Sequence, residues 1–356
     1  MNFLITIVLF LIVLFFYIHL TEQYKKSEDM EIYEMDYTNN KQLQETCNLK
    51  QPIVFEWMHF IPEFFKEIND GINGFLETSS QKNICVKDLF DHYKHPDESV
   101  NGVPLSYSAG HALMSSDTNK HFYTENNAFF VEETMLFSEM EKVDAFLKPP
   151  FSFFKKYDFM FGSQDAHTPL RFHKNQRKFL IVVKGKIRVK MSPYGSTPFL
   201  EMIKDYENYE FKSPVNVFSP PQNKHQENAL KNVRFLEFDV FCGNVLFVPP
   251  YWWYSIKYET SGGGGGVENN ENEDEKKVYS LNISTFVLEC NYNSVMNNVA
   301  NLQDVGKYYL QQQNIFTKHV KSTSPIAGVG VEEVVEETTT PQPPPPMIFK
   351  ETFFES

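Results

Sequence analysis

The sequence lacks the cysteine pairs that mark zinc and redox sites. Its 356 residues include four cysteines, and no two of them are separated by only two residues. Zinc-binding and disulfide-exchange motifs use pairs at that spacing, so neither kind of site is predicted. We expect four free thiols in a reducing compartment, at Cys47, Cys85, Cys242 and Cys290.

Long basic runs are also missing, and the formal net charge is −13. A protein that binds nucleic acid usually carries a basic patch or stripe that neutralises phosphates. We therefore expect no nucleic-acid partner.

The first twenty residues contain no Lys, Arg, Asp or Glu, and Phe3–Ile18 is strongly apolar. Twenty helical residues span about 30 Å, the thickness of the hydrocarbon core of a bilayer. A cleaved signal peptide is the alternative, but no basic segment precedes the apolar run and no small-residue cleavage site follows it. We expect an uncleaved, single-pass transmembrane anchor at 1–20, followed by a juxtamembrane linker at 21–30. Lys25 and Lys26 then place the rest of the chain on the cytosolic side.

Two stretches each read as a strand, a turn and a second strand. In the first, the apolar run Leu180–Val183 ends near Gly185, and Ile187–Met191 then alternates apolar and basic residues as a half-buried strand does. In the second, Val245–Val248 is stopped by two prolines, and an aromatic cluster leads into another strand at Ser255–Tyr258.

These stretches resemble the two motifs of the cupin barrel, and their residues are most similar to those of the JmjC branch of 2-oxoglutarate oxygenases. The segments that carry the resemblance are Thr168-Pro-Leu-Arg-Phe-His173 and Val248-Pro-Pro-Tyr-Trp-Trp-Tyr254. Cupin-like proteins of large DNA viruses carry similar strands. The resemblance implies a mostly β fold over 31–316: a double-stranded β-helix (jelly-roll) barrel with flanking helices.

The residues that bind iron in the family are replaced here. Where the JmjC motifs place His, Asp and His, this chain has Arg171, His173 and Tyr254, and Lys178 stands at the fourth cupin ligand position. Arginine has no lone pair to donate, and tyrosine is protonated at neutral pH. We therefore expect a barrel without an iron site and without a cofactor.

Several roles remain open for these residues. His173 could be a remnant metal ligand, or Asp165, His167 and His173 could form a displaced metal site. A buried Arg171 needs an anionic partner, which could be a protein carboxylate or the carboxylate or phosphate of a ligand. The aromatic residues could plug the cavity or stack on a ligand. The predicted pocket residues are Arg171, His173, Arg177, Lys178, Trp252, Trp253 and Tyr254.

The sequence thus predicts a membrane-anchored, non-catalytic binding or scaffold module that could have a protein partner. One alternative is an oxygenase of the hydroxylase or demethylase type that uses Fe(II) and 2-oxoglutarate with unconventional ligands. Another is a sensor that binds a small anion through Arg171.

Composition and periodicity divide the remaining chain. We expect helical segments at 83–93, 130–147 and 291–316. The Gly-rich, acidic stretch 261–277 reads as a disordered insert, and the Pro-rich stretch 317–356 as a disordered tail.

Overall fold

We describe the fold from a computed structural model of the chain. The structure describes residues 2–68, 79–259 and 285–313. The predicted disordered insert at 261–277 and tail at 317–356 lie outside these residues.

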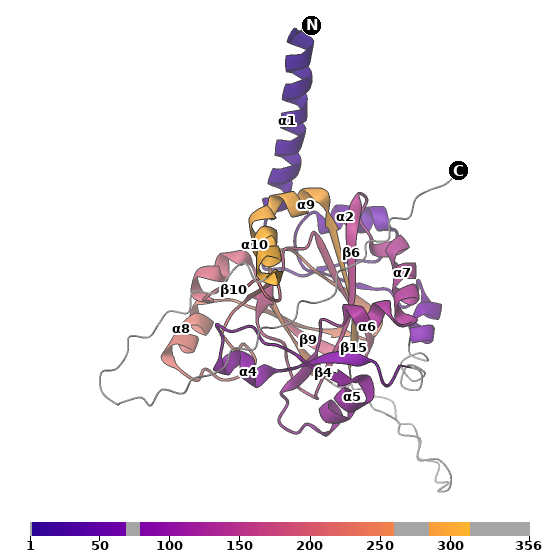
Figure 1. Cartoon of the computed structure of the whole chain (residues 1–356), viewed down its shortest axis with the longest axis vertical. Coiled ribbons are helices and arrows are strands. Elements are labelled where there is room, and N and C mark those ends of the chain that lie inside the picture. The colour runs from indigo at the N-terminus through magenta and orange to yellow at the C-terminus, as the bar shows by residue number, and fades with distance from the viewer. Residues whose placement is uncertain (1, 69–78, 260–284, 314–356) are drawn as a thin grey trace, which may run out of the picture. The chain divides into compact units, whose positions relative to one another are not determined.

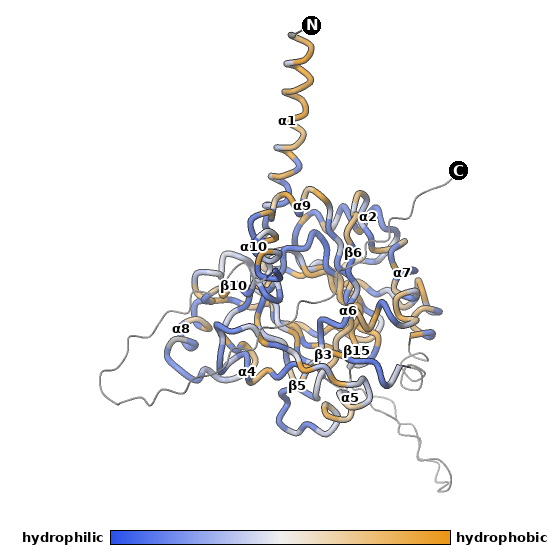
Figure 2. Tube along the Cα trace, viewed as in Figure 1, coloured by the Kyte–Doolittle hydropathy of each residue, from blue (hydrophilic) through white to orange (hydrophobic). Residues whose placement is uncertain are grey.

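The chain begins with a long apolar helix, α1 (Asn2–Tyr24). Its segment Phe3–Tyr24 is long and apolar enough to cross a membrane, and none of its most apolar window is buried against the rest of the protein. Figure 2 shows that most of α1 is hydrophobic. The expected N-terminal apolar helix is therefore present.

Fifteen strands among the described residues form two sheets. β1 and β2 are parallel, and the other strand pairs are antiparallel. The nine-stranded sheet has the order β1 (Tyr33–Glu34), β2 (Ile53–Glu56), β13 (Asn244–Val248), β8 (Arg177–Lys184), β15 (Phe286–Ser294), β6 (Ser152–Gly162), β5 (Phe122–Thr124), β3 (Asn83–Asp88) and β4 (Val103–Ser106). The six-stranded sheet has the order β10 (Ile203–Asp205), β11 (Glu210–Lys212), β7 (Arg171–Phe172), β14 (Trp253–Glu259), β9 (Lys186–Ser192) and β12 (Leu236–Phe241).

Both predicted strand–turn–strand stretches are confirmed, and each crosses from one sheet to the other. The chain passes from β8 to β9 through Gly185, whose φ of 74° lies in the left-handed region that glycine adopts without strain. The second stretch passes from β13 to β14. The first strands pair with each other in the large sheet and the second strands pair in the small one, for example Val245 with Ile181 and Tyr254 with Met191.

The two sheets pack face to face over one hydrophobic cluster. It takes Leu180 and Val182 from β8 and Val189 and Ile256 from the small sheet. Successive strand residues point to opposite faces, so the neighbouring Ile181 packs on the other side of the large sheet. This places β8, as a strand buried on both faces, at the centre of the protein.

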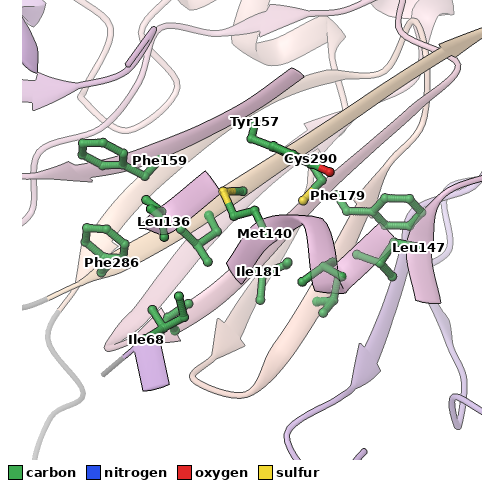
Figure 3. Packing of buried hydrophobic residues seen from close by; sticks show 14 of the residues in the cluster. Ile68, Leu136, Met140, Leu147, Tyr157, Phe159, Phe179, Ile181, Phe286 and Cys290 are labelled. Carbon is green, nitrogen blue, oxygen red and sulfur yellow. The ribbon is translucent and has the colours of Figure 1, made fainter. Parts of the chain in front are cut away.

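A second cluster fills the space between the large sheet and helices that include α2 (Asn40–Cys47), α5 (Tyr107–Ser116), α6 (Ala128–Glu132) and α7 (Leu136–Leu147). Figure 3 shows Leu136 of α7 near Phe159 and Phe286, and Leu147 of the same helix near Phe179. A third cluster covers the outer face of the small sheet, together with α8 (Lys224–Asn232). The described part of the chain is thus rich in β-sheet, with two sheets and accompanying helices.

The predicted helical segments are only partly correct. Residues 83–93 form β3 followed by the short helix α4 (Leu89–Lys94), because Ile84 and Val86 alternate into the core as strand residues do. The segment 130–147 contains the end of α6 and all of α7. In the last segment β15 continues to Ser294, and two helices follow, α9 (Val295–Ala300) and α10 (Leu302–Gln312).

Candidate functional site

A polar cavity of about 290 Å³ is lined by residues from both sheets. Four of the seven predicted pocket residues line it: Arg171, His173, Lys178 and Tyr254. Arg171 on β7 and Tyr254 on β14 are direct cross-strand partners. Lys178 comes from the facing β8, and His173 also lines the cavity. The fold therefore brings together all four positions at which the resemblance places metal ligands.

Arg171 is buried and held by two carboxylates. Its Nη1 donates to Glu125 Oε1 at 2.8 Å, and its Nη2 donates to Glu125 Oε2. Glu210 Oε1 lies 3.3 Å from Nη1. A second buried cation, Lys87, donates from Nζ to the same Glu125 Oε1 at 2.8 Å and lies 3.5 Å from Glu210 Oε1. The anionic partner of Arg171 is therefore a protein carboxylate.

These four groups form a charge-balanced cluster with two cations and two carboxylates. Burial alone would raise the pKa of Glu125, but Arg171 and Lys87 lower that pKa well below its usual range. Burial alone would lower the pKa of Lys87, but Glu125 and Glu210 raise it. Glu125 and Lys87 therefore stay ionised at neutral pH together with Arg171.

Lys178 forms a second ion pair in the same cavity. Its Nζ lies 2.9 Å from Glu289 Oε2 and donates to the Tyr254 hydroxyl at 2.9 Å. The side-chain amide of Asn291 donates to the other oxygen of Glu289. Burial opposes the charge on Lys178, but Glu289 raises its pKa overall. Lys178 and Tyr254, which stand at two positions where the resemblance places metal ligands, are thus hydrogen-bonded to each other.

His173 is neutral and both of its ring nitrogens have partners. Nε2 lies 3.0 Å from the carbonyl oxygen of Val248, and Nδ1 lies 3.1 Å from the backbone nitrogen of Asn175. Nδ1 therefore accepts and Nε2 donates. Burial, followed by the charge of Lys178, lowers the pKa of His173 well below its ordinary value. No ring lone pair of His173 is left for a metal ion.

The residues present do not fit an iron ion of the oxygenase type. Such a site needs two imidazoles and a carboxylate with open positions, whereas Arg171 and Tyr254 supply a fixed cation and a phenol paired with an ammonium group. Within the described ranges, no group of three or more His, Cys, Asp or Glu side chains could hold a metal ion.

The displaced metal site considered above is not assembled either. Asp165 and His167 line a different cavity, of about 620 Å³. There Asp165 bridges Lys120 and Lys257, each at 3.0 Å, and the Tyr93 hydroxyl lies 3.3 Å from His167 Nε2. His173 belongs to the smaller cavity.

Three predicted pocket residues do not line the cavity. Arg177 precedes Lys178 on β8, so it points to the opposite face, where Nε donates to Gln44 Oε1 at 2.9 Å. Trp252 donates from its indole to the carbonyl oxygen of Lys50 at 3.0 Å. Trp253 packs outside the small sheet and donates to the Thr197 hydroxyl at 3.0 Å. The two indoles fill core positions rather than the rim.

Several site residues were missed from the sequence. Glu125 follows β5, Lys87 lies on β3, and Glu289 lies on β15, all remote from the two motifs. Asp158 on β6 also lines the cavity and accepts backbone N–H groups of Asn126 and Asn127 at 2.7 Å each. Burial and then Glu289 raise the pKa of Asp158 to about 6.

Comparison with models of known protein families gives no match for this chain. HSPB1-associated protein 1 of Rattus norvegicus is 21% identical over 236 residues, which cover 62% of this chain and 49% of that protein. HSPB1-associated protein 1 of Bos taurus is 30% identical over 97 residues, which cover 27% of this chain and 20% of that protein. The chain therefore matches about half, or less, of the length of these curated relatives, and the relation is distant.

Proposed function

We propose that this protein is a membrane-anchored, cupin-like module that binds or scaffolds a protein partner without catalysing a reaction. One observation carries the proposal. Each of the replaced ligand positions is already occupied by a partner within the chain: Arg171 by Glu125, His173 by two backbone groups, and Lys178 and Tyr254 by each other.

The cupin-like part of the proposal rests on the arrangement of the two motif stretches. Each contributes one strand to the large sheet and the next strand to the small sheet, and the stretches lie side by side. A double-stranded β-helix is built from chain segments that alternate between two facing sheets in this way. The sequence resemblance and the core between the sheets support the same fold.

The anchoring part rests on α1. The helix is strongly apolar over Phe3–Ile18, and its most apolar window is not buried in the described part of the protein. A helix that is hydrophobic all round is unstable in water unless it is buried in protein or lipid. Lys25 and Lys26 at its C-terminal end favour a cytosolic position for the domain. A protein that keeps residue 1 after membrane isolation would support the anchor, and an N-terminus created beyond residue 20 would indicate a cleaved signal sequence.

The partner is proposed to be a protein. The relatives are named for their association with another protein, HSPB1, and that association is a property of those proteins. For this chain, an ion-paired interior leaves the surface as the part available for recognition. A small-anion sensor is less well supported, because Glu125 already supplies the anionic partner that Arg171 requires.

Metal binding by the full chain in detergent tests the proposal. Fe(II) affinity is measured anaerobically with 2-oxoglutarate, for the natural sequence and for an Arg171→Ala/His173→Ala variant. We expect no stoichiometric binding and no difference between the two proteins. Tight, one-to-one binding that the double substitution abolishes would overturn the non-catalytic interpretation and support the oxygenase alternative.

A further inference from the structure

We propose that the end of the domain that carries α9 docks onto the bilayer surface, with exposed apolar side chains entering the interfacial layer. The inference rests on the proposed anchoring by α1. It adds a second membrane contact that fixes how the domain is oriented.

No free linker separates α1 from the described part of the domain. The Tyr24 hydroxyl, on the last residue of α1, donates to the carbonyl oxygen of Ala300 at the end of α9. Two residues later, Lys26 Nζ lies 3.4 Å from the ring centroid of Tyr194. Glu28 then accepts the backbone N–H of Gly195 at 3.1 Å. The chain is therefore attached to the domain from the last turn of the helix onward.

Helix length then decides where the bilayer surface lies. The 23 residues of α1 extend about 34 Å at 1.5 Å per residue, and a hydrocarbon core of about 30 Å requires roughly 20 of them. The domain already contacts α1 within its last turn. Once α1 spans the bilayer, α9 must therefore lie within the interfacial layer or directly against it (Figure 1).

This end of the domain presents apolar side chains to solvent. Val295 and Val299 of α9 are 47% and 46% exposed, and Leu302 at the start of α10 is 65% exposed. The four-residue spacing of Val295 and Val299 places both side chains on one face of α9, and Leu302 follows at the start of the next helix. Water is a poor environment for such a face, whereas the lipid interface would bury it.

An aromatic turn lies next to this helical face. Phe151 and Phe153 are 82% and 71% exposed. β6 begins between them at Ser152, which pairs with Ser294, the N-cap residue of α9. Figure 2 shows hydrophobic segments at this end of the domain, near the base of α1. Two phenylalanines and three aliphatic residues from separate segments thus gather where the anchor leaves the domain.

Lipid fits this surface better than a protein partner does. A protein bound to the same face would have to enter between the domain and the bilayer, and the contacts of Tyr24, Lys26 and Glu28 leave no linker to make room for it. An apolar face beside a membrane anchor inserts about 5–10 Å into the boundary between headgroups and acyl chains. The binding should also be insensitive to salt, because apolar contacts are not screened.

The test uses the full chain in phosphatidylcholine nanodiscs that contain a lipid with a doxyl quencher. A polarity-sensitive fluorophore is attached to Phe153→Cys in a Cys85→Ser/Cys242→Ser background, since Cys47 and Cys290 are buried. The matched control carries the fluorophore at Phe241→Cys. Phe241 is 53% exposed and pairs with Lys186, next to the Gly185 turn at the opposite end of the sheets.

We expect emission at shorter wavelength, and quenching several-fold stronger, at position 153 than at position 241, with no change in high salt. Equal quenching at the two positions would overturn the docking proposal. Alkaline carbonate extraction of natural-sequence membranes separates the two hypotheses. If the protein stays in the membrane but position 153 is not quenched, the docking proposal is wrong and the anchor proposal stands. If the protein is released, both proposals are wrong.

Discussion

Arg171 and Glu125 face each other across the cavity as a two-point ion pair, with Nη1 2.8 Å from Oε1 and Nη2 bonded to Oε2. Arg171 stands where the resemblance places the first iron ligand, and Glu125 comes from the chain just after β5. The planar guanidinium matches a carboxylate at two points, which a lysine could not do. Arg171 is thereby part of a structural contact.

The charge balance of this cluster predicts unequal effects of removing its members. Glu125→Gln leaves Arg171 and Lys87 facing only Glu210, so a buried positive charge is uncompensated. We expect a loss of about 3–5 kcal/mol in the free energy of unfolding. Arg171→Met should lose roughly half as much, because the excess negative charge then falls on Glu210, whose side chain is 17% exposed and reached by water. Urea unfolding of both variants measures the difference.

The double variant Glu125→Gln/Arg171→Met is the control for this prediction. It leaves Lys87 with Glu210 as a balanced pair, so it should be more stable than Glu125→Gln alone. Additive losses in the double variant would show that the four charges do not act as a cluster.

Substitutions of Tyr254 and Lys178 should also have unequal effects on stability. Tyr254→Phe removes one hydrogen bond to Lys178 and leaves the ion pair with Glu289 in place, so we expect a loss of about 1.5 kcal/mol. Lys178→Met strands Glu289 in the interior and should lose about 3–5 kcal/mol. Thermal or urea unfolding compares the two, and a larger loss for Tyr254→Phe would contradict the assigned partners.

Buried histidines predict that the protein is labile in acid. Burial lowers the pKa of His92, His111 and His167 to about 4. Between about pH 6.5 and pH 4 the unfolded chain therefore binds protons that the folded chain does not bind. Stability falls as pH falls through this window, by up to about 3 kcal/mol for each histidine.

Asp158 opposes this trend. Its pKa is raised to about 6, so protonation favours the folded state between about pH 6 and pH 4, by up to about 3 kcal/mol. One group acts against four, because the pKa of His173 is lowered as well, and the net stability should still fall. Urea unfolding across this pH range measures the slope. His111→Leu, which removes a ring nitrogen without a partner in the described structure, should flatten it, and an unchanged slope would refute the role of His111.

Two methionines at α7 test the packing of this helix against the large sheet. Met140 of α7 is fully buried, and Met135, which precedes the helix, is 73% exposed. Met140→Ala should lower the free energy of unfolding by about 2–5 kcal/mol, because it leaves a cavity against the sheet. Met135→Ala should change it by less than about 0.5 kcal/mol. Urea denaturation measures both losses. Similar losses for the two variants would contradict the packing of Met140 against the sheet in Figure 3.

Local pattern was sufficient to predict much of the fold. The apolar run before Gly185, the alternation after it, the apolar run before Pro249 and the apolar N-terminal helix each appear as predicted. Residues 83–88 were misread because Ile84, Cys85 and Val86 form a short apolar group, whose length and spacing do not distinguish a strand from a helix.

The candidate site was less predictable, since its partners are distant in the chain. The cost of burying Arg171 without an anion predicts that a partner exists, but nothing in the sequence singles out Glu125 from 45 other acidic residues. Strand alternation could have separated Arg177 from Lys178, because adjacent residues cannot face the same cavity. Trp252 and Trp253 were assigned to the pocket by proximity in sequence, and their hydrogen-bond partners lie elsewhere.

The ion pairs of the cavity also act as alignment marks for the strands. On β7, Arg171 faces the cavity, while its neighbour Phe172 stacks on Phe211 outside the sheet. A shift of β7 by one residue in register would exchange the faces of Arg171 and Phe172. The guanidinium would then lie among aromatic rings, and Glu125 would lose its counterion. A misaligned β7 is therefore less stable. This matters because β7 pairs with β14 through a single residue pair, which alone would not fix the register. The buried ion pairs thereby help to fix the alignment of β7 in the small sheet.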